Sequence, residues 1–384
     1  MRVALFTREY PPDVYGGAGV HVDFLARHLR SRVDLDVLCM GAERDDAIAV
    51  PEQDGRFPQA NSALHVLSTD LVMTAHAAGA DLAHSHTWYA NMAGHWTKLL
   101  YDVPHVVTAH SLEPQRPWKA EQLGGGYRLS SWAEQTAYLG ADAVVAVSRG
   151  MADDILAAYP EVSPDRVHVI YNGIDADFYA PDSDTSLIES LGVDLARPYA
   201  AFVGRITRQK GVPHLLRAAS SFAPELQIVL MAGAADTAEL KAETDELIDR
   251  LQRERDGVIL VSEMKPREAV RQVLSHALAF LCPSVYEPLG IVNLEAMACE
   301  TAVVASAVGG IPEVVVDGET GLLVPFDPDD TARFEADIAA RVNELVADPA
   351  RARAMGKAGR ERAVTSFDWG AIADQTVALY RSLL

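Results

Sequence analysis

Short apolar segments alternate with helix-like segments along most of the chain, and this alternation limits the possible folds more than any other feature of the sequence. In the first half, the segments that we expect to form strands are Val3–Thr7, Leu35–Cys39, Leu64–Leu67, Leu82–His84, His105–Ala109, Ala143–Val147 and Val167–Tyr171. The segments between them that have helical spacing of apolar residues include Val20–Arg30, Trp88–Leu100, Trp132–Leu139 and Ala152–Ala158. Repeated strand–helix units predict an α/β fold with a mostly parallel, doubly wound sheet.

A polar, turn-rich stretch divides this alternation into two halves. Asn172-Gly173 interrupts the pattern, and Ile174–Ser186 follows it. The strands expected in the second half are Ala200–Val203, Gln227–Met231, Val258–Val261, Ala279–Cys282, Ala302–Ala305 and Leu322–Val324, joined by helices such as Val212–Ser220 and Ala238–Arg253. Because 384 residues exceed one ordinary core, we expect two Rossmann-like domains over residues 1–171 and 172–367, which face a cleft. The last segment, 368–384, is expected to be a helix that packs back on the first domain.

The charge balance and the cysteines exclude several classes of protein. Acidic residues outnumber basic ones 54 to 33, which gives a formal net charge of −21. Such a surface repels nucleic acids and anionic membranes, so we expect neither as a partner. No apolar run approaches the ~20 residues of a membrane span, and the N-terminal segment does not have the pattern of a signal peptide. The three cysteines are odd in number and lack metal-ligand spacing, which indicates reduced thiols in a cytoplasmic protein.

Loops that follow strands are the places to look for function, because doubly wound sheets bind ligands beyond the carboxyl ends of their strands. The loop Gly204-Arg205-Ile-Thr-Arg-Gln-Lys-Gly211 follows the strand Ala200–Val203. A guanidinium grips phosphate oxygens in a fork, and an ammonium acts as a point charge, so Arg205 and Lys210 predict a diphosphate site. The alternative is a solvated basic turn.

The stretch from Ser284 to Glu300 combines carboxylates with the start of a helix. Glu287 lies in a turn-rich elbow after the strand Ala279–Cys282, and Glu295 lies on the helix that follows. The backbone amides of Leu289, Gly290 and Ile291 come at the helix start, where an anion is stabilised. This arrangement suits a ligand with hydroxyl groups at both ends and phosphate between them, such as a nucleotide sugar. The alternative is that both glutamates are solvated surface acids.

Two loops of the first half are also candidates. Gly16, Gly17 and Gly19 follow the first strand and leave room for backbone to approach a phosphate. They do not form the dinucleotide-binding fingerprint, since its third glycine is missing. His110 ends the strand His105–Ala109 and could donate a hydrogen bond to a sugar, or it could be purely structural.

These motifs together resemble a known family. Gly204-Arg205…Lys210-Gly211, Glu287-Pro-Leu-Gly290 with Glu295, and Gly309-Gly-Ile-Pro-Glu313 are similar to the motifs of retaining glycosyltransferases with the two-domain GT-B fold. The family, glycosyltransferase family 4-like, includes glycogen and sucrose-phosphate synthases. Within it, Thr7-Arg-Glu-Tyr-Pro-Pro and His110-Ser-Leu-Glu-Pro-Gln-Arg-Pro-Trp-Lys119 resemble the short actinobacterial branch, whose members use ADP-glucose.

The resemblance implies a role for each matching residue. It implies that Arg205 and Lys210 neutralise the leaving diphosphate. It also implies that Glu287 with the amides of Leu289, Gly290 and Ile291 holds the donor glucose and the distal phosphate. Further implied contacts are Glu295 with the ribose, His110 near the transferred sugar, and Gly16 and Gly17 facing the diphosphate. Where long glycogen synthases carry a lysine before the paired glycines, this chain has Tyr15. That departure removes one cation and leaves the use of a glucan primer open.

The acceptor implied by the resemblance is glucose 1-phosphate, which would give α-maltose 1-phosphate for glycogen and α-glucan biosynthesis. The alternatives are a glycogen synthase that elongates an α-1,4-glucan primer from ADP-glucose, or another GT-B transferase with a different acceptor. Glu9, Arg116, Lys119 and Arg128 are the candidate acceptor-binding residues, and a solvated loop is the other interpretation of the three basic ones. The sequence leaves the oligomeric state open between a monomer and a homodimer.

We expect no cofactor and no metal. The Asp-x-Asp triplets, Asp34-Leu-Asp36 and Asp327-Pro-Asp329, lie at a strand start and in a late loop, where we interpret them as solvated acids. Two other classes of protein share the doubly wound architecture. A nicotinamide-dependent dehydrogenase would need the missing third glycine, and a two-lobed sugar-binding protein would have no use for Arg205 and Lys210.

Overall fold

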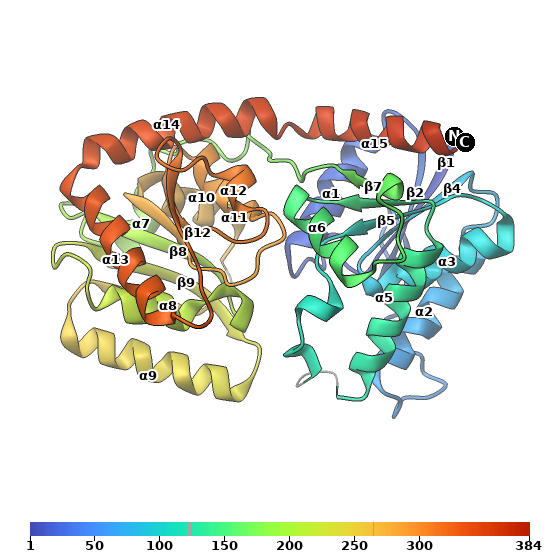
Figure 1. Ribbon diagram of the computed structural model, residues 1–384, viewed down its shortest axis with the longest axis horizontal. Helices are drawn as coiled ribbons and strands as arrows, with labels where there is room; N and C mark the ends of the chain where they lie inside the picture. The colour runs from blue at the N-terminus through green and yellow to red at the C-terminus, as the bar shows by residue number, and fades with distance from the viewer. Residues whose placement is uncertain (121–123, 264) are drawn as a thin grey trace. The chain divides into compact units, whose positions relative to one another are not determined.

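The computed structural model describes residues 1–120, 124–263 and 265–384 and divides them into two compact units (Figure 1). The first unit is Met1–Gly173 together with Trp369–Leu384, and the second is Ile174–Asp368. The C-terminal segment thus returns to the unit that the N-terminal half forms. Each unit holds one parallel sheet.

The first unit has a 7-stranded sheet in the order β3-β2-β1-β4-β5-β6-β7, and all of its strand pairs are parallel. Its strands are β1 (Arg2–Thr7), β2 (Asp34–Met40), β3 (Ile48–Val50), β4 (Leu82–His86), β5 (His105–Ala109), β6 (Ala143–Ala146) and β7 (Val167–Val169). The order reverses direction after β3, between β1 and β4. The predicted doubly wound sheet is therefore confirmed, and the carboxyl ends of β1, β4 and β5 lie side by side at one edge.

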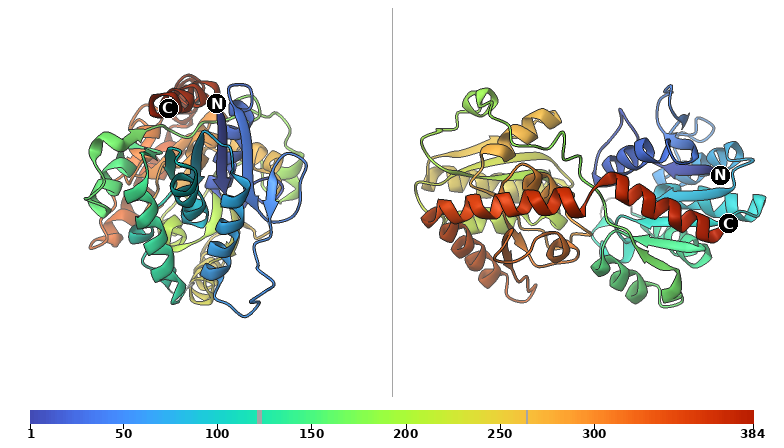
Figure 2. Two further views of the ribbon diagram at one scale, coloured as in Figure 1. Left: turned by 90° about the vertical axis from the view of Figure 1, so that its right-hand side faces the viewer. Right: turned by 90° about the horizontal axis from the view of Figure 1, so that it is seen from above.

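Helices cover both faces of this sheet. They are α1 (Gly17–Leu29), α2 (Ser62–His76), α3 (Trp88–Tyr101), α5 (Gly126–Gly140), α6 (Arg149–Ala158) and α15 (Trp369–Leu383), with short 3-10 turns at η1 (Glu113–Gln115) and η2 (Pro164–Arg166). Successive side chains of a strand point to opposite faces, so Val3 and Leu5 of β1 enter one core while Ala4 and Phe6 enter the other. The first core includes α15, which packs beside α1 (Figure 2).

The second unit repeats the plan with a 6-stranded parallel sheet in the order β10-β9-β8-β11-β12-β13. Its strands are β8 (Tyr199–Ile206), β9 (Gln227–Ala235), β10 (Val258–Val261), β11 (Ala279–Cys282), β12 (Ala302–Ser306) and β13 (Gly321–Val324). Its helices are α7 (Ser186–Ser190), η3 (Arg208–Lys210), α8 (Val212–Ala219), α9 (Ala238–Glu254), α10 (Arg267–His276), α11 (Ile291–Ala298), α12 (Ile311–Val314), α13 (Thr331–Ala347) and α14 (Pro349–Ser366). Because β8 and β11 are neighbours, the loops that follow them emerge together.

Two assignments made from the sequence are corrected. The segment Leu64–Leu67, expected as a strand, belongs to helix α2. Asn61 caps the start of this helix, because its side chain accepts a hydrogen bond from the Ala63 amide at 3.0 Å. The apolar run was misread because burial continues at helical spacing as far as Met73. The short edge strand β3 was missed, since three residues carry almost no periodic signal.

Among the helices in the described ranges, none is long and apolar enough to cross a membrane.

Candidate functional site

Lys210 and Glu287 meet in the second unit although 77 positions separate them in the chain. Lys210 closes the short helix η3, where the Thr207 side chain accepts a hydrogen bond from the Lys210 amide at 3.2 Å. Gly211 follows with φ 62°, and a Cβ there would lie 2.1 Å from the Pro283 carbonyl oxygen. Glycine therefore allows the two loops to touch, which places Lys210 Nζ 2.6 Å from Glu287 Oε2.

Glu287 is held from several sides. Ser284 Oγ donates to Glu287 Oε2 at 3.2 Å, and the Gly310 amide donates to the Glu287 carbonyl at 3.0 Å. Gly309 has φ 51°, and a Cβ on it would lie 2.1 Å from that same carbonyl oxygen. The motif Gly309-Gly-Ile-Pro-Glu313 thus supports Glu287 from the neighbouring strand–helix loop. The Glu287 side chain is 9% exposed and that of Lys210 25%, so the pair is largely shielded from solvent.

The electrostatics of Lys210 follow from this environment. Burial opposes the charged ammonium, but the nearby carboxylate of Glu287 outweighs burial and raises the pKa of Lys210 above its usual value. Lys210 is therefore a permanent cation at neutral pH. A cation fixed beside a carboxylate can bind a phosphate while the carboxylate accepts hydrogen bonds from sugar hydroxyls.

Helix α11 starts immediately after this pair. Gly290 caps it with φ 95°, in the left-handed region, and a Cβ there would lie 2.5 Å from the side-chain nitrogen of Asn293. The predicted amides of Leu289, Gly290 and Ile291 therefore belong to the elbow and the first turn of α11, as expected from the sequence. Within the described chain, both polar side-chain atoms of Asn293 are buried without a hydrogen-bond partner. Sequence reasoning missed this residue, because an asparagine inside an apolar helical pattern carries no distinctive signal.

Glu295 is a buried acid, not a solvated one. Burial raises the pKa of Glu295 to about 7, and the Tyr179 hydroxyl, Arg267 and Lys210 oppose that shift. Arg267 lies 5.3 Å over the ring of Tyr179, so these side chains form one polar cluster around the carboxyl group. A carboxyl group of this kind changes protonation near neutral pH and can accept hydrogen bonds from ribose hydroxyls when ionised.

Arg205 lies in the same loop as Lys210 but is much more exposed, with 56% of its side chain accessible. Its Nη1 atom is 3.0 Å from Asp236 Oδ1 at the end of β9. Asp236 was not predicted, since its role depends on β8 and β9 being neighbours. Because Arg205 is exposed and pairs with one carboxylate among the described residues, its guanidinium can reorient toward an anion.

In the first unit, Glu9 holds the glycine turn. Its Oε2 atom accepts hydrogen bonds from the amides of Tyr15 at 2.7 Å and Gly16 at 2.8 Å. A Cβ on Gly19 would lie 2.7 Å from that oxygen, which explains the glycine. The turn therefore binds an internal carboxylate in this structure, and Gly17 begins α1. The predicted contacts of Glu9 with an acceptor, and of Gly16 and Gly17 with a diphosphate, stay predictions.

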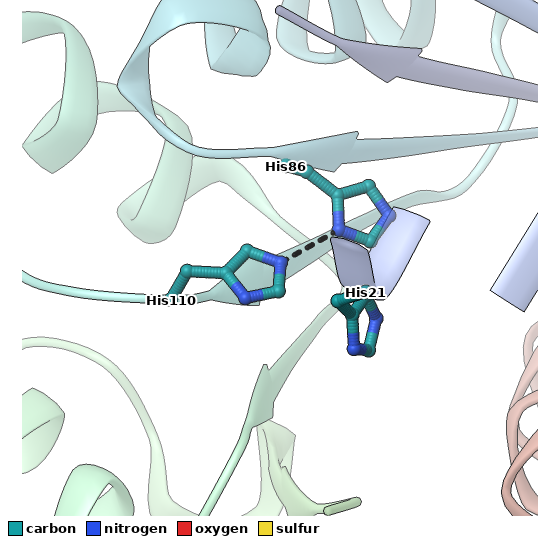
Figure 3. Close-up of side chains that lie close together, drawn as sticks. All are labelled: His21, His86 and His110. Carbon is teal, nitrogen blue, oxygen red and sulfur yellow. Dashed lines mark hydrogen bonds between the residues drawn. The ribbon is translucent and has the colours of Figure 1, made fainter. Parts of the chain in front are cut away.

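His110 lies in a cluster with two other histidines (Figure 3). His86, at the end of β4, places Nδ1 3.0 Å from His110 Nε2, and His21 of α1 stands edge-on to His110 with ring centroids 4.7 Å apart. Burial lowers the pKa of all three, that of His21 to about 4, so the rings are neutral at pH 7. The hydrogen bond to His86 fixes the orientation of the His110 ring.

This cluster is the one group among the described residues whose side chains could hold a metal ion. One nitrogen from each ring lies within 4.8 Å of the other two. Ligands of one zinc ion stand closer, about 3.4 Å apart at tetrahedral geometry. The rings would therefore have to draw together, and the His86–His110 hydrogen bond would have to give way.

The predicted acceptor residues are partly engaged within the chain. Glu113, whose side chain is 0% exposed, pairs with Arg116 at 2.6 Å and lies 3.6 Å from Lys119. Arg128 is exposed near the start of α5. Arg116 and Lys119 are therefore brought together around one buried carboxylate, and sequence reasoning missed Glu113 because nothing in its neighbourhood marks it as buried.

A second buried acid supports Glu113. Glu134 Oε1 accepts from the Glu113 amide at 2.8 Å and from the Tyr159 hydroxyl at 2.5 Å. Burial, with the neighbouring charge of Glu113, raises the pKa of Glu134 to about 7. The loop that carries the basic residues is thus anchored to the core of the first unit.

Comparison with known proteins identifies the family of the chain. Residues 183–362 match the family described as glycosyl transferases group 1, and residues 15–178 match the one described as glycosyltransferase family 4. Over 100% of both chains, the protein is 60% identical to the alpha-maltose-1-phosphate synthase of Mycolicibacterium smegmatis and 56% identical to that of Mycobacterium tuberculosis. Among solved structures it is similar to sucrose-phosphate synthase from Thermosynechococcus elongatus, with a TM-score of 0.80 and 27% identity over 100% of this chain and 98% of that one.

Proposed function

Because the chain belongs to the group 1, family 4 glycosyltransferases of GT-B fold, we propose that it is a retaining α-1,4-glucosyltransferase. It moves glucose from ADP-glucose to glucose 1-phosphate and forms α-maltose 1-phosphate for α-glucan and glycogen biosynthesis. The name of its 60% identical relative supports the product. The resemblance of the loops after β1 and β5 to the short ADP-glucose-using branch supports the donor.

The observation that carries the proposal is the contact of Lys210 Nζ with Glu287 Oε2 at 2.6 Å, beside the start of α11. When the glucosyl bond breaks, negative charge builds up on the departing ADP. The Lys210 ammonium is already oriented and largely shielded from water, so it stabilises this charge with little reorganisation. Glu287 then accepts hydrogen bonds from glucose hydroxyls, and its position is fixed by Ser284 and Gly310.

Arg205 and the helix start complete the donor side. Arg205 exchanges Asp236 for a phosphate oxygen, which its exposure permits. The amides of Leu289, Gly290 and Ile291 add the partial positive charge of the helix N-terminus. Glu295 accepts from the ribose, with Tyr179 and Arg267 close by.

The acceptor side uses the first unit. His110, neutral and oriented by His86, donates a hydrogen bond to the transferred sugar. Arg116, Lys119 and Arg128 supply positive charge for the phosphate of glucose 1-phosphate, in a chain whose net charge is −21. We assign Arg128 to this role because it is exposed at the start of α5.

The proposed reaction uses no metal ion and no cofactor. Lys210, Arg205 and the α11 amides provide the charge that a divalent cation provides in other nucleotide-sugar enzymes. Activity in the presence of EDTA is the corresponding expectation. The three free, buried cysteines fit a reducing cytoplasmic setting.

Product analysis tests the proposal. Radiolabelled ADP-glucose is incubated with glucose 1-phosphate in one reaction and with glycogen in another. We expect a phosphorylated disaccharide, which alkaline phosphatase should convert to a neutral sugar. NMR should show an α-1,4 linkage between its two glucose units. Label that enters glycogen alone would replace the proposal by primer elongation, and a β-linked product would refute retention. UDP-glucose in a parallel reaction tests the nucleotide preference.

A further inference from the structure

Arg8, Tyr89 and Lys119 converge at one edge of the first unit's sheet. Arg8 follows β1, Tyr89 lies in the first turn of α3 after β4, and Lys119 lies in the loop after β5. Because β1, β4 and β5 are adjacent parallel strands, their carboxyl ends meet there. The Arg8 guanidinium carbon lies 4.4 Å from the centre of the Tyr89 ring, and Lys119 Nζ lies 5.7 Å from it.

Both cations therefore lie close to the same aromatic ring, that of Tyr89. The ring of Trp88, which is buried, packs against Tyr89 with centroids 4.3 Å apart and planes tilted by 31°, and so helps to hold the Tyr89 ring in place. Two like charges beside one ring repel each other, and an anion between them removes this repulsion. The backbone is strained at Thr87, the residue before Trp88, because its φ of 64° is a value that β-branched residues avoid.

The internal partners of these cations leave positive charge available. Among the described residues, Arg8 Nε has one carboxylate partner, Glu52 Oε1 at 3.1 Å, and the Arg8 side chain is 32% exposed. Lys119 stands 3.6 Å from Glu113, beyond hydrogen-bond distance, because Arg116 takes that carboxylate at 2.6 Å. Lys119 is therefore held less closely by Glu113 than Arg116 is, and Arg8 and Lys119 can turn toward a ligand.

We propose that Arg8 and Lys119, over the face of Tyr89, bind the phosphate of a hexose phosphate acceptor. This inference rests on the proposed function. Lys119 was already a candidate acceptor-binding residue from the sequence, and the structure adds Arg8 and Tyr89 to it. Tyr15, 53% exposed and with its ring 5.8 Å from Arg8, borders the site and offers a surface for a sugar ring. A phosphate between the two cations relieves their repulsion and forms charge-assisted hydrogen bonds.

The first experiment measures Arg8→Gln. We expect KM for glucose 1-phosphate to rise about 10- to 100-fold, the usual effect of losing a hydrogen bond between charged groups, while KM for ADP-glucose changes less than about twofold. Inorganic phosphate should compete with glucose 1-phosphate in the wild type, and its inhibition constant should rise in parallel. Arg2→Gln is the matched control, because Arg2 starts the same strand and pairs with Asp36 at 2.7 Å.

The second experiment separates binding from a structural role. Glu52→Gln removes the carboxylate partner of Arg8 and frees its guanidinium. If the Arg8–Glu52 pair only stabilises the fold, both variants raise KM or lower the unfolding temperature alike. If Arg8 binds phosphate, Glu52→Gln lowers KM for glucose 1-phosphate or the inhibition constant of phosphate, opposite to Arg8→Gln. Should Arg8→Gln fail to fold, Arg8→Lys and Glu52→Gln carry the same test.

The outcomes distinguish the two levels of the argument. A wild-type enzyme that uses glucose as well as glucose 1-phosphate refutes the phosphorylated acceptor and therefore the proposed function. A wild type that requires the phosphate, combined with Arg8→Gln at unchanged KM for glucose 1-phosphate, refutes this inference alone. If free phosphate inhibits the enzyme but KM for glucose 1-phosphate does not depend on Arg8, then phosphate binds at another site. That result would also refute this inference.

Discussion

Replacement of Lys210 by alanine is the perturbation whose effect follows most fully from the structure. It removes the cation 2.6 Å from Glu287 and leaves the carboxylate with Ser284 as its remaining side-chain hydrogen-bond partner in the described chain. Loss of one preorganised donor at a developing charge costs about 3 kcal/mol, so kcat should fall about 100-fold.

The stability cost should be smaller than the catalytic one. Breaking a fully buried ion pair costs about 3–5 kcal/mol, but the 25% exposure of the Lys210 side chain and the Ser284 hydroxyl reduce this to roughly 1–2 kcal/mol. For a unit of this size that corresponds to a decrease of a few degrees in Tm. The protein should remain cooperatively folded at the assay temperature.

Steady-state kinetics and thermal unfolding, measured on the same preparations, separate the two effects. Lys241→Ala is the control, since Lys241 also pairs with a carboxylate, Asp245 at 2.5 Å, but on the exposed surface of α9, where such pairs contribute little. A folded Lys210→Ala enzyme with kcat within threefold of the wild type would refute the assignment of Lys210 to the leaving group.

Four further predictions follow. Arg205→Ala should lower turnover about 100-fold with almost no change in Tm, because Arg205 is exposed and Asp236 is its one carboxylate partner in the part of the chain that the structure describes; kinetics and calorimetry check this. Burial raises the pKa of Glu295 to about 7 from its ordinary 4.5. Between these two pH values the folded protein keeps a proton that the unfolded chain releases, so the free energy of unfolding decreases as the pH rises from 4.5 through 7. Glu295→Gln should therefore unfold at a higher temperature than the wild type at pH 8, and this difference in Tm should narrow toward pH 4. A difference in Tm that does not depend on pH would contradict the raised pKa of Glu295. Gly309→Ala should lower both Tm and kcat, since a Cβ would meet the Glu287 carbonyl at 2.1 Å. Activity should survive exhaustive treatment with EDTA, and its loss with recovery on adding a divalent metal would show that the reaction needs an ion.

The fold could be predicted from the sequence because strand–helix alternation is a local signal. Apolar runs such as His105–Ala109 and Ala279–Cys282 are short, bounded by turn residues and buried, and both are strands. The prediction of a strand at Leu64–Leu67 was wrong, because a run of four apolar or amphipathic residues does not distinguish a strand from one turn of a buried helix. The cap at Asn61 was the signal that could have decided it.

The second unit's candidate site could be predicted in outline for a topological reason. Loops that follow parallel strands gather at one edge, so Lys210 after β8 and Glu287 after β11 had to lie near each other once the strands were neighbours. The electrostatic environment of Glu295 could not be predicted, because Tyr179 and Arg267, which interact with its carboxyl group, come from distant parts of the chain. Local spacing describes the helix but not what packs on it.

The first unit shows where sequence reasoning ends. The glycines after β1 predicted room for a phosphate, but nothing in the sequence indicated that Glu9, six residues before Tyr15, accepts hydrogen bonds from the amides of this turn. Arg8 attracted no attention, since a single arginine in a turn is unremarkable in the sequence. Its position over Tyr89 depends on the adjacency of β1 and β4, which the order of strands along the chain does not reveal.

The most direct test of the central claim compares the affinities of ADP and AMP by isothermal titration calorimetry. The claim is that Lys210 and Arg205 bind the second phosphate of the donor nucleotide, the group by which ADP differs from AMP. The wild type should bind ADP at least ~10-fold more tightly than AMP, and the double variant Lys210→Ala/Arg205→Ala should bind the two almost equally. An undiminished preference for ADP in a folded double variant would contradict the account.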